Sequence, residues 1–305
     1  MSTVISPKDN DNELLEKLKN DTVFQLDFDL MSSQQIDDLV DGYHQYEADD
    51  KSNHKNDFSN TNYGYKLVDN DDVKRAILTL NNDVFVDQLK EYYESYNIPS
   101  LDYNFPDSFK NNLYQLYHHM YAMIRRMLML ISKDTFGDVN YLQRFVSKEN
   151  FVMVVNYYFA VKMDGNGDVV CKRFDDHFDF SLVTITLSDD YQHKEFNFEF
   201  LKDEKWQSMD NHDHKFTVFY GMLMEILTAG KYKALKHRTL TNGKNRDRFM
   251  IGFFAQPDED KQLEICDEHA PLLEGYDYDH YNREISYNNF MRETMCSQLL
   301  DVDTE

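Results

Sequence analysis

Cysteine is scarce in this chain of 305 residues, which contains only Cys171, Cys266 and Cys296. Their odd number and wide separation argue against a disulfide framework and against a paired-cysteine metal site. The most apolar helical stretch, residues 120–131, is too short to cross a bilayer and contains Arg125 and Arg126. The N-terminus lacks the apolar core of a secretory signal. We therefore expect a cytoplasmic protein with no membrane association.

Basic side chains are outnumbered, with 32 Lys and Arg against 55 Asp and Glu, so the formal net charge is −23. A surface this acidic repels nucleic acid and anionic membranes, although its simplest role is solubility. We therefore expect a small molecule as the binding partner, no nucleic acid and no obligate protein partner. The chain has only 5 Pro and no proline-rich linker, while 41% hydrophobic residues can build a full core. These features predict one catalytic domain overall.

Residues 1–149 are interpreted as a mixed region that contains helices. Apolar residues recur at three- and four-residue spacing in the clearest helix, Phe109–Ile131, whose methionines we expect in the core. Weaker patterns predict a tail with a short helix in residues 1–20, a helix at 32–46, two helical stretches within 71–93, and strands at 22–29 and 63–68. The polar residues 47–62 predict a surface loop, with a pocket lid as the alternative.

From residue 150 onward the pattern changes to short strands separated by turns. Strands are predicted at Phe151–Lys162, Phe180–Leu187, Glu195–Leu201, Phe216–Tyr220, His237–Leu240 and Arg248–Phe254. Many short strands after a helical platform are typical of a jelly roll, the double-stranded β-helix. We predict an α+β, mainly β fold with a jelly-roll catalytic core over 150–257. A C-terminal helical extension is expected over 258–305, with a helix at 285–300.

His177 and Asp179 precede the apolar, β-branched run of residues 180–187. In a strand, side chains two residues apart point to the same face, which suits two neighbouring ligands of one metal ion. The pair alone is a weak signal, because a His-x-Asp sequence is expected about once by chance in such a chain. Two other pairs, His193-x-Glu195 and His212-x-His214, lie in polar, loop-like surroundings and are interpreted as surface groups.

Five signals follow one another in a recognisable order. They are Asn156 with Tyr158, His177 with Asp179, Trp206, the run 224–237 that ends in His237, and Arg248 before a phenylalanine-rich strand. In this order the chain resembles the plant-type, isopenicillin N synthase-like iron(II)/2-oxoglutarate-dependent dioxygenases. Within that family it is similar in size to kainoid synthases, which close a pyrrolidine ring on a prenylated glutamate.

The resemblance implies that His177, Asp179 and His237 bind iron(II) and leave three coordination positions open for 2-oxoglutarate and O2. It further implies that Arg248 forks onto the distal carboxylate of 2-oxoglutarate. Asn156 and Tyr158 would supply the remaining contacts with this co-substrate.

The sequence departs from the family pattern in two places. Met250 stands where the family has Ser, so one hydroxyl donor is missing and Tyr158 or another donor must compensate. A Gly-Gly-Leu turn of the family is replaced at residues 193–197. Arg246 is a rival for the role of Arg248, which is favoured because it directly precedes the phenylalanine-rich strand. Trp206 is expected in the core.

The resemblance implies an oxidoreductase that abstracts hydrogen from a small, amino-acid-derived, carboxylate-bearing substrate and releases succinate and CO2. A ring closure of the kainoid type, in secondary metabolism, is the leading hypothesis, and a hydroxylase or desaturase is the alternative. Lys172 and Arg173 would receive substrate carboxylates, although exposure to solvent explains them equally well. Two further alternatives stay open, an oxidase of the same fold without 2-oxoglutarate and a jelly-roll binding protein without metal.

Overall fold

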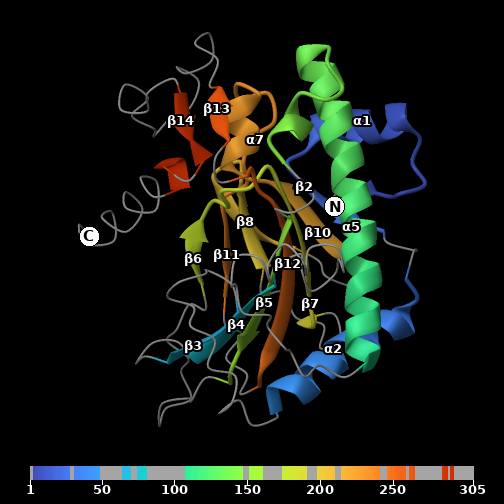
Figure 1. Cartoon of the computed structure of the whole chain (residues 1–305), viewed down its shortest axis with the longest axis vertical. Coiled ribbons are helices and arrows are strands. Elements are labelled where there is room, and N and C mark those ends of the chain that lie inside the picture. The colour runs from blue at the N-terminus through green and yellow to red at the C-terminus, as the bar shows by residue number, and fades with distance from the viewer. Residues whose placement is uncertain are drawn as a thin grey trace, which may run out of the picture.

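The computed structural model describes residues 3–27, 31–48, 64–69, 74–80, 107–146, 151–160, 174–190, 198–209, 214–240, 246–258, 261–264, 284–287 and 289–291. Four helical segments precede or interrupt the main strands: α1 (Asp11–Asn20), α2 (Ser33–Ala48), α5 (Asp107–Phe136) and α7 (Met222–Leu227). A short 3-10 helix, η2, covers Leu142–Arg144. Figure 1 shows the order of these elements in space.

Eight strands form one large sheet in the order β1-β2-β10-β7-β12-β5-β4-β3. Their bounds are β1 (Thr3–Ile5), β2 (Val23–Leu26), β3 (Gly64–Asp69), β4 (Lys74–Leu80), β5 (Phe151–Tyr158), β7 (Val183–Ser188), β10 (Phe216–Tyr220) and β12 (Arg248–Ala255). A smaller sheet has the order β6-β11-β8-β9, from β6 (Phe174–His177), β11 (His237–Thr239), β8 (Phe198–Lys202) and β9 (Lys205–Ser208). A third, two-stranded sheet pairs β13 (Gln262–Glu264) with β14 (Glu284–Ser286). The two larger sheets are the jelly roll predicted from the strand pattern.

Helices cover one face of the large sheet. In Figure 1 the long helix α5, drawn in green, runs beside the strands of this sheet, with α2 across its lower end. Tyr43 of α2 packs on this face, with its ring centroid 5.4 Å from that of Phe249 and 5.9 Å from that of Tyr157. Met120 and Met127 of α5 are completely buried, which confirms the core role predicted for the methionine stripe. The opposite face of the sheet is therefore left to face the smaller sheet.

The long helix and most of the strands in the jelly-roll region are confirmed within a few residues. The predicted helix at 109–131 is α5, which extends it at both ends to Asp107 and Phe136. The predicted strand at 216–220 is β10, and that at 248–254 is β12 with one residue more.

Three expectations about secondary structure were wrong. Residues 74–80 form β4 and not a helix, because this segment pairs on both sides, with β3 and β5. The tail contains a strand, β1, which pairs in parallel with β2 before the short helix α1 begins. The predicted C-terminal helix begins instead with β14, after which residues 287 and 289–291 are helical. The rest of that helix, and the predicted loop over residues 49–62, lie outside the described residues.

The large sheet contains strands from both sides of residue 150. β4 of the N-terminal region pairs with β5 of the predicted jelly-roll core along six residues. The boundaries at 149 and 257 stay predictions. Among the helices that the structure describes, none is long and apolar enough to cross a membrane.

Candidate metal centre and co-substrate site

His177 and His237 come from two neighbouring strands of the small sheet. They are opposite one another in the antiparallel pair of β6 and β11, and their ring centroids lie 4.3 Å apart. Asp179 follows two residues after His177, beyond the end of β6, where the chain leaves the small sheet and enters β7 of the large one. The expectation that His177 and Asp179 share one strand was therefore wrong. The turn between the sheets nevertheless brings the carboxylate to both imidazoles.

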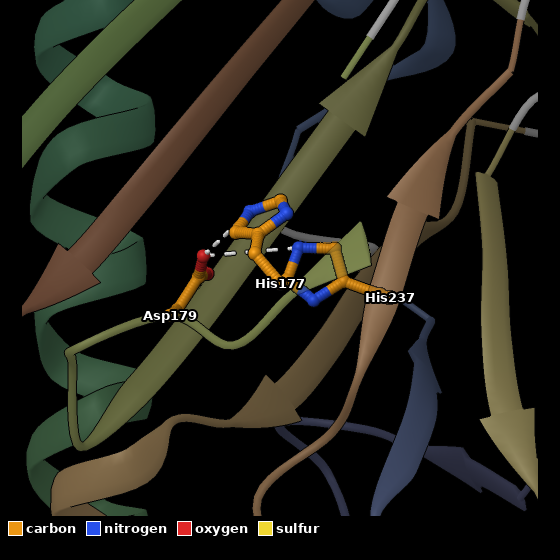
Figure 2. Close-up of side chains that lie close together, drawn as sticks. All are labelled: His177, Asp179 and His237. Carbon is orange, nitrogen blue, oxygen red and sulfur yellow. Dashed lines mark ion pairs between the residues drawn. The ribbon is translucent and has the colours of Figure 1, made fainter. Parts of the chain in front are cut away.

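The three side chains point toward one another, as Figure 2 shows. Asp179 Oδ1 lies 3.4 Å from His177 Nε2 and 3.7 Å from His237 Nε2. One ligand atom from each residue lies within 4.8 Å of the others. A metal ion about 2.1 Å from each ligand would set neighbouring ligand atoms about 3 Å apart, so small inward movements suffice. Two imidazoles and one carboxylate are the donor set that suits iron(II) with open positions, so these residues fit that metal.

His237 presents a neutral nitrogen to the centre of the triad. Its Nδ1–H donates to the backbone carbonyl of Leu235 at 3.2 Å, because a carbonyl oxygen can only accept. The Nε2 lone pair is thereby directed at the triad, in the manner of metal-binding histidines. Burial lowers the pKa of His237 to about 4, with Asp179 opposing and His177 adding to the effect. The ring is neutral at physiological pH and ready to bind a metal.

The carboxylate of Asp179 is ionised and held in place. Burial pushes its pKa up, but the imidazoles of His237 and His177 and the Thr184 hydroxyl together hold the pKa below its usual value. Thr184 Oγ1, on β7, donates to Asp179 Oδ2 at 2.7 Å, and Ser181 Oγ lies 2.7 Å from Thr184 Oγ1. Asp179 is thus fixed to the large sheet while the two histidines belong to the small one.

The segment before His237 is shaped by α7. The carboxylate of Glu225 accepts the backbone N–H of Ala234 at 2.7 Å and the ammonium of Lys233 at 2.9 Å. Ala229 and Gly230 both have positive φ values, which end the helix and reverse the chain. The run 224–237 that resembles the family therefore builds the turn that delivers His237.

Apolar side chains enclose one side of the triad. The rings of Phe198 and Phe219 lie 5.2 Å and 4.6 Å from the ring of His237, measured between centroids. They belong to a buried apolar cluster between the two sheets: Val23, Phe198, Phe200, Met209, Phe219 and Leu235. This cluster makes the small-sheet side of the site apolar.

The predicted co-substrate residues share the inner face of the large sheet. In the antiparallel pair of β5 and β12, Tyr158 is opposite Arg248 and Asn156 is opposite Met250. Directly opposed residues point to the same face, and their neighbours Tyr157 and Phe249 point to the helices. The Arg248 guanidinium carbon lies 5.6 Å from the centroid of the Tyr158 ring. The structure thus brings Tyr158 and Arg248 together, with Asn156 two residues along the strand and half-buried.

Arg248 is engaged by a carboxylate of the chain itself. Its Nε donates to Asp190 Oδ1 at 2.9 Å, and its Nη2 donates to Asp190 Oδ2 at 2.8 Å. Both side chains are almost inaccessible, with exposed fractions of 2% and 0%. Asp190 also accepts from Ser188 Oγ at 2.8 Å. Burial works to lower the pKa of Arg248, but the neighbouring carboxylate of Asp190 outweighs burial and raises that pKa above its usual value. The guanidinium therefore stays charged.

Arg246, the rival candidate, lies in an adjoining polar network. Its Nη1 donates to Asp189 Oδ2 at 3.2 Å, and its Nη2 lies 3.5 Å from Asp190 Oδ1. Asp189 is also 3.5 Å from His44 Nε2 on α2. His44 Nδ1 in turn lies 3.0 Å from the hydroxyl of Tyr157. Arg246 thus belongs to a network that joins the sheet to the helices.

Trp206 does not occupy the core. It lies half-buried on β9, and the guanidinium of Arg238 stacks over its ring with Cζ 4.0 Å from the ring centroid. The expectation of a core tryptophan was wrong, because β9 is the edge strand of the small sheet. His214 lies apart from the triad and pairs with Asp37 at 3.1 Å. The remaining candidates lie outside the described residues: Lys172, Arg173, His193, Glu195, His212 and the three cysteines.

Comparison with known proteins agrees with this geometry. A family model of the 2OG-Fe(II) oxygenase superfamily matches residues 149–257, the stretch that holds the triad, Asn156, Tyr158 and Arg248. This segment, about a third of the chain, is thus similar to the 2OG-Fe(II) oxygenase superfamily.

Two curated relatives illustrate how far the similarity reaches. Jasmonate-induced oxygenase 2 of Arabidopsis thaliana is 32% identical over 101 residues, which are 32% of this chain and 26% of that protein. 1-Aminocyclopropane-1-carboxylate oxidase 1 of Cucumis melo is 29% identical over 126 residues, 41% of this chain and 37% of the relative. The matched region thus spans well under half the length of these relatives.

The fold similarity extends over nearly the whole chain. A 2OG-Fe(II) oxygenase family protein from Caulobacter crescentus, of known crystal structure, superposes with a TM-score of 0.71. The match covers 97% of this chain and 99% of that one at 16% identity. At this identity the comparison establishes a shared fold, the jelly roll, and nothing about substrate.

Sequence reasoning overlooked the carboxylate that pairs with Arg248. Asp190 comes three residues after the end of the predicted strand at 180–187, and continued alternation along that strand puts Thr184, Ser188 and Asp190 on one face. The signal was therefore present in the sequence. Its partner could not be identified, because the pairing of β7 with β12 depends on contacts about sixty residues apart.

Proposed function

We propose that this protein is an iron(II)/2-oxoglutarate-dependent oxygenase that acts on a small molecule. The observation that carries the proposal is the meeting of His177, Asp179 and His237 with their ligand atoms turned toward one centre. Bound iron(II), with 2-oxoglutarate and O2, would supply an oxidant that removes hydrogen from a substrate C–H bond and yields succinate and CO2. The residues of the chain hold, orient and shield that centre.

Each of these residues has a distinct part in the proposal. His177, Asp179 and His237 would be the metal ligands, and Thr184 would fix the orientation of Asp179 through its 2.7 Å hydrogen bond. Phe198 and Phe219 would keep water from the His237 side of the centre. On the inner face of the large sheet, Asn156, Tyr158 and Arg248 would form the binding site for the co-substrate.

Arg248 would bind the co-substrate in a restricted way. Its Nε and one N–H of Nη2 bind Asp190, which leaves Nη1 and the second N–H of Nη2 for another carboxylate. Nη1 is buried and lacks a hydrogen-bond partner among the described residues. An orphaned buried donor beside Tyr158 is consistent with a ligand oxygen at this position.

The substrate and the outcome of hydrogen abstraction stay predictions. An amino-acid-derived, carboxylate-bearing substrate and a kainoid-type ring closure in the cytoplasm remain the leading hypotheses, with hydroxylation or desaturation as the alternative. The residues suggested to receive substrate carboxylates, Lys172 and Arg173, lie outside the described residues.

The proposal is tested by measuring succinate. Purified protein with iron(II), ascorbate, O2 and 2-oxoglutarate should release succinate slowly alone and faster with a substrate from a screen of free and prenylated amino acids. His237→Ala should release none. A wild-type protein that binds one iron(II) per chain and consumes O2 with a substrate, yet forms no succinate, would contradict the use of 2-oxoglutarate.

One observation favours a second candidate, an oxidase of the same fold that works without 2-oxoglutarate. The pairing of Arg248 with Asp190 occupies the group that would otherwise fork onto the distal carboxylate. The succinate measurement distinguishes the two candidates, since this oxidase would consume O2 with its substrate and form no succinate.

A further inference from the structure

The guanidinium of Arg248 already binds one carboxylate, that of Asp190, at its Nε–Nη2 edge. Its Nε donates to Asp190 Oδ1 at 2.9 Å and its Nη2 donates to Asp190 Oδ2 at 2.8 Å. This fork-to-fork arrangement is the geometry by which arginine recognises a carboxylate of a ligand. Asp190 therefore occupies one of the two edges at which the guanidinium could fork onto the distal carboxylate of a 2-oxo dicarboxylic acid.

Asp190 is held firmly in this place. Ser188 Oγ donates to its Oδ2 at 2.8 Å, and Arg246 Nη2 lies 3.5 Å from its Oδ1. Its side chain is fully buried, so displacement would leave a carboxylate in a low-dielectric setting without its main partner. A ligand carboxylate could not replace Asp190 at Arg248 without this cost.

The charges around Arg248 are already balanced. Asp189 and Asp190 offset Arg246 and Arg248 through three ion pairs of 3.5 Å or less, which join Asp189 to Arg246, Arg246 to Asp190, and Asp190 to Arg248. A third carboxylate would therefore find no uncompensated positive charge among these four groups. Arg75 lies further along the same row, on the other side of Tyr158, as the register of β4, β5 and β12 shows.

We propose that Asp190 is a built-in carboxylate that takes over the anchoring edge of Arg248, so that the site accepts 2-oxo acids with little regard for a distal carboxylate. The end of the guanidinium, formed by Nη1 and the second N–H of Nη2, is left for the ligand, but Asp190 already offsets the charge of that guanidinium. Asp190 would thus determine co-substrate specificity. The inference rests on the proposed function, because it requires that the site binds a 2-oxo acid.

The test is a pair of ligands that differ only in the group at issue. 2-Oxoglutarate and 2-oxopentanoate have the same chain length and the same 2-oxo acid end, and only the first has a distal carboxylate. Each is titrated by calorimetry into wild-type protein loaded with Mn(II), so that binding is read without turnover. We expect dissociation constants within about tenfold of one another, since the charge that a distal carboxylate would meet is already offset by Asp190.

Removal of the built-in charge should create the missing preference. In Asp190→Asn, 2-oxoglutarate should bind about tenfold or more tightly than in wild type, because a ligand carboxylate now meets an uncompensated guanidinium. Binding of 2-oxopentanoate should change by less than about threefold, since it makes no contact there. If this variant does not fold, the wild-type comparison decides alone.

Different failures have different meanings. A wild-type preference for 2-oxoglutarate above about a hundredfold would overturn the inference, and its loss in Arg75→Gln would identify Arg75 as the anchor instead. Weaker binding of both acids in Asp190→Asn would also overturn it, because Asp190 would then only support the site. If Mn(II) binds but neither acid does, the proposed use of 2-oxoglutarate fails and the inference fails with it.

Discussion

The buried pair of Arg248 and Asp190 makes a prediction about stability that needs no ligand. Arg248→Met removes the guanidinium and leaves Asp190, which is fully buried, without its main partner. Breaking such a pair costs about 3–5 kcal/mol in the free energy of unfolding, because an uncompensated charge stays in the interior. In a domain of this size the melting temperature should fall by roughly 10 °C.

The double variant sharpens this prediction. Arg248→Met together with Asp190→Leu replaces the pair by apolar groups, which is often neutral, so its cost should be at most about 1–2 kcal/mol. The losses in unfolding free energy caused by Arg248→Met alone and by Asp190→Leu alone should then sum to far more than the loss in the double variant. The difference is the coupling free energy of the pair, which should be at least about 2 kcal/mol. Urea unfolding followed by far-ultraviolet circular dichroism measures all three variants and wild type.

Arg144→Met is the matched control. Arg144 also pairs with an aspartate, Asp138, but its side chain is 62% exposed. Loss of such a surface pair should cost less than about 1 kcal/mol. If Arg248→Met costs no more than Arg144→Met, or if the single and double costs simply add, the buried pair described here is absent from the folded protein.

Three further predictions concern the support of the triad and the fold around it. Thr184→Val removes the hydroxyl that donates to Asp179 and should weaken Mn(II) binding by about 10–100-fold in calorimetry. Thr186→Val, on the same face of β7, is the control and should leave Mn(II) affinity unchanged. Equal Mn(II) affinities in the two variants would contradict the role of Thr184. Gly221→Ala would place a Cβ against the backbone carbonyl oxygen of Ser181 and 2.7 Å from that of Asp179. It should lower the free energy of unfolding in urea by about 1–3 kcal/mol and weaken metal binding as well. An unchanged free energy and metal affinity would show that these contacts are not tight. Burial works to raise the pKa of Asp134, but Lys231, Tyr232 and Lys19 hold that pKa below its usual value of 3.8. The stability that the ionised Asp134 contributes is therefore fully present above pH 3.8 and is lost as the pH falls through the pKa of the folded state. Asp134→Asn should therefore cost about 1–3 kcal/mol at pH 7 and progressively less below pH 4, and a cost independent of pH would refute the ionised pair.

The sequence predicted those parts of the structure that depend on local pattern. The apolar stripe of α5 and the alternating strands β5, β10 and β12 follow from the spacing of their own residues, and they are confirmed. β4 was mistaken for helix because its strand character comes from pairing with β3 and β5, which a local pattern does not contain.

The candidate site shows the same division. Order and spacing were enough to select His177, Asp179 and His237, since the surrounding sequence resembles a family in which the matching residues bind one metal ion. The turn that carries Asp179 out of the strand could not be predicted, because it depends on where β6 ends and β7 begins in two different sheets. The partner of Arg248 depends on the register between β7 and β12, which only the folded chain establishes.

The central claim is that three side chains from two sheets share one metal ion, and metal binding by His237→Ala tests it most directly. Iron(II) titrated anaerobically into wild-type protein should bind at one ion per chain, and the affinity should fall by at least about a hundredfold in His237→Ala. His214→Ala is the control, because His214 pairs with Asp37 and lies outside the triad. Undiminished iron(II) binding by His237→Ala, at the same stoichiometry as wild type, would contradict the account.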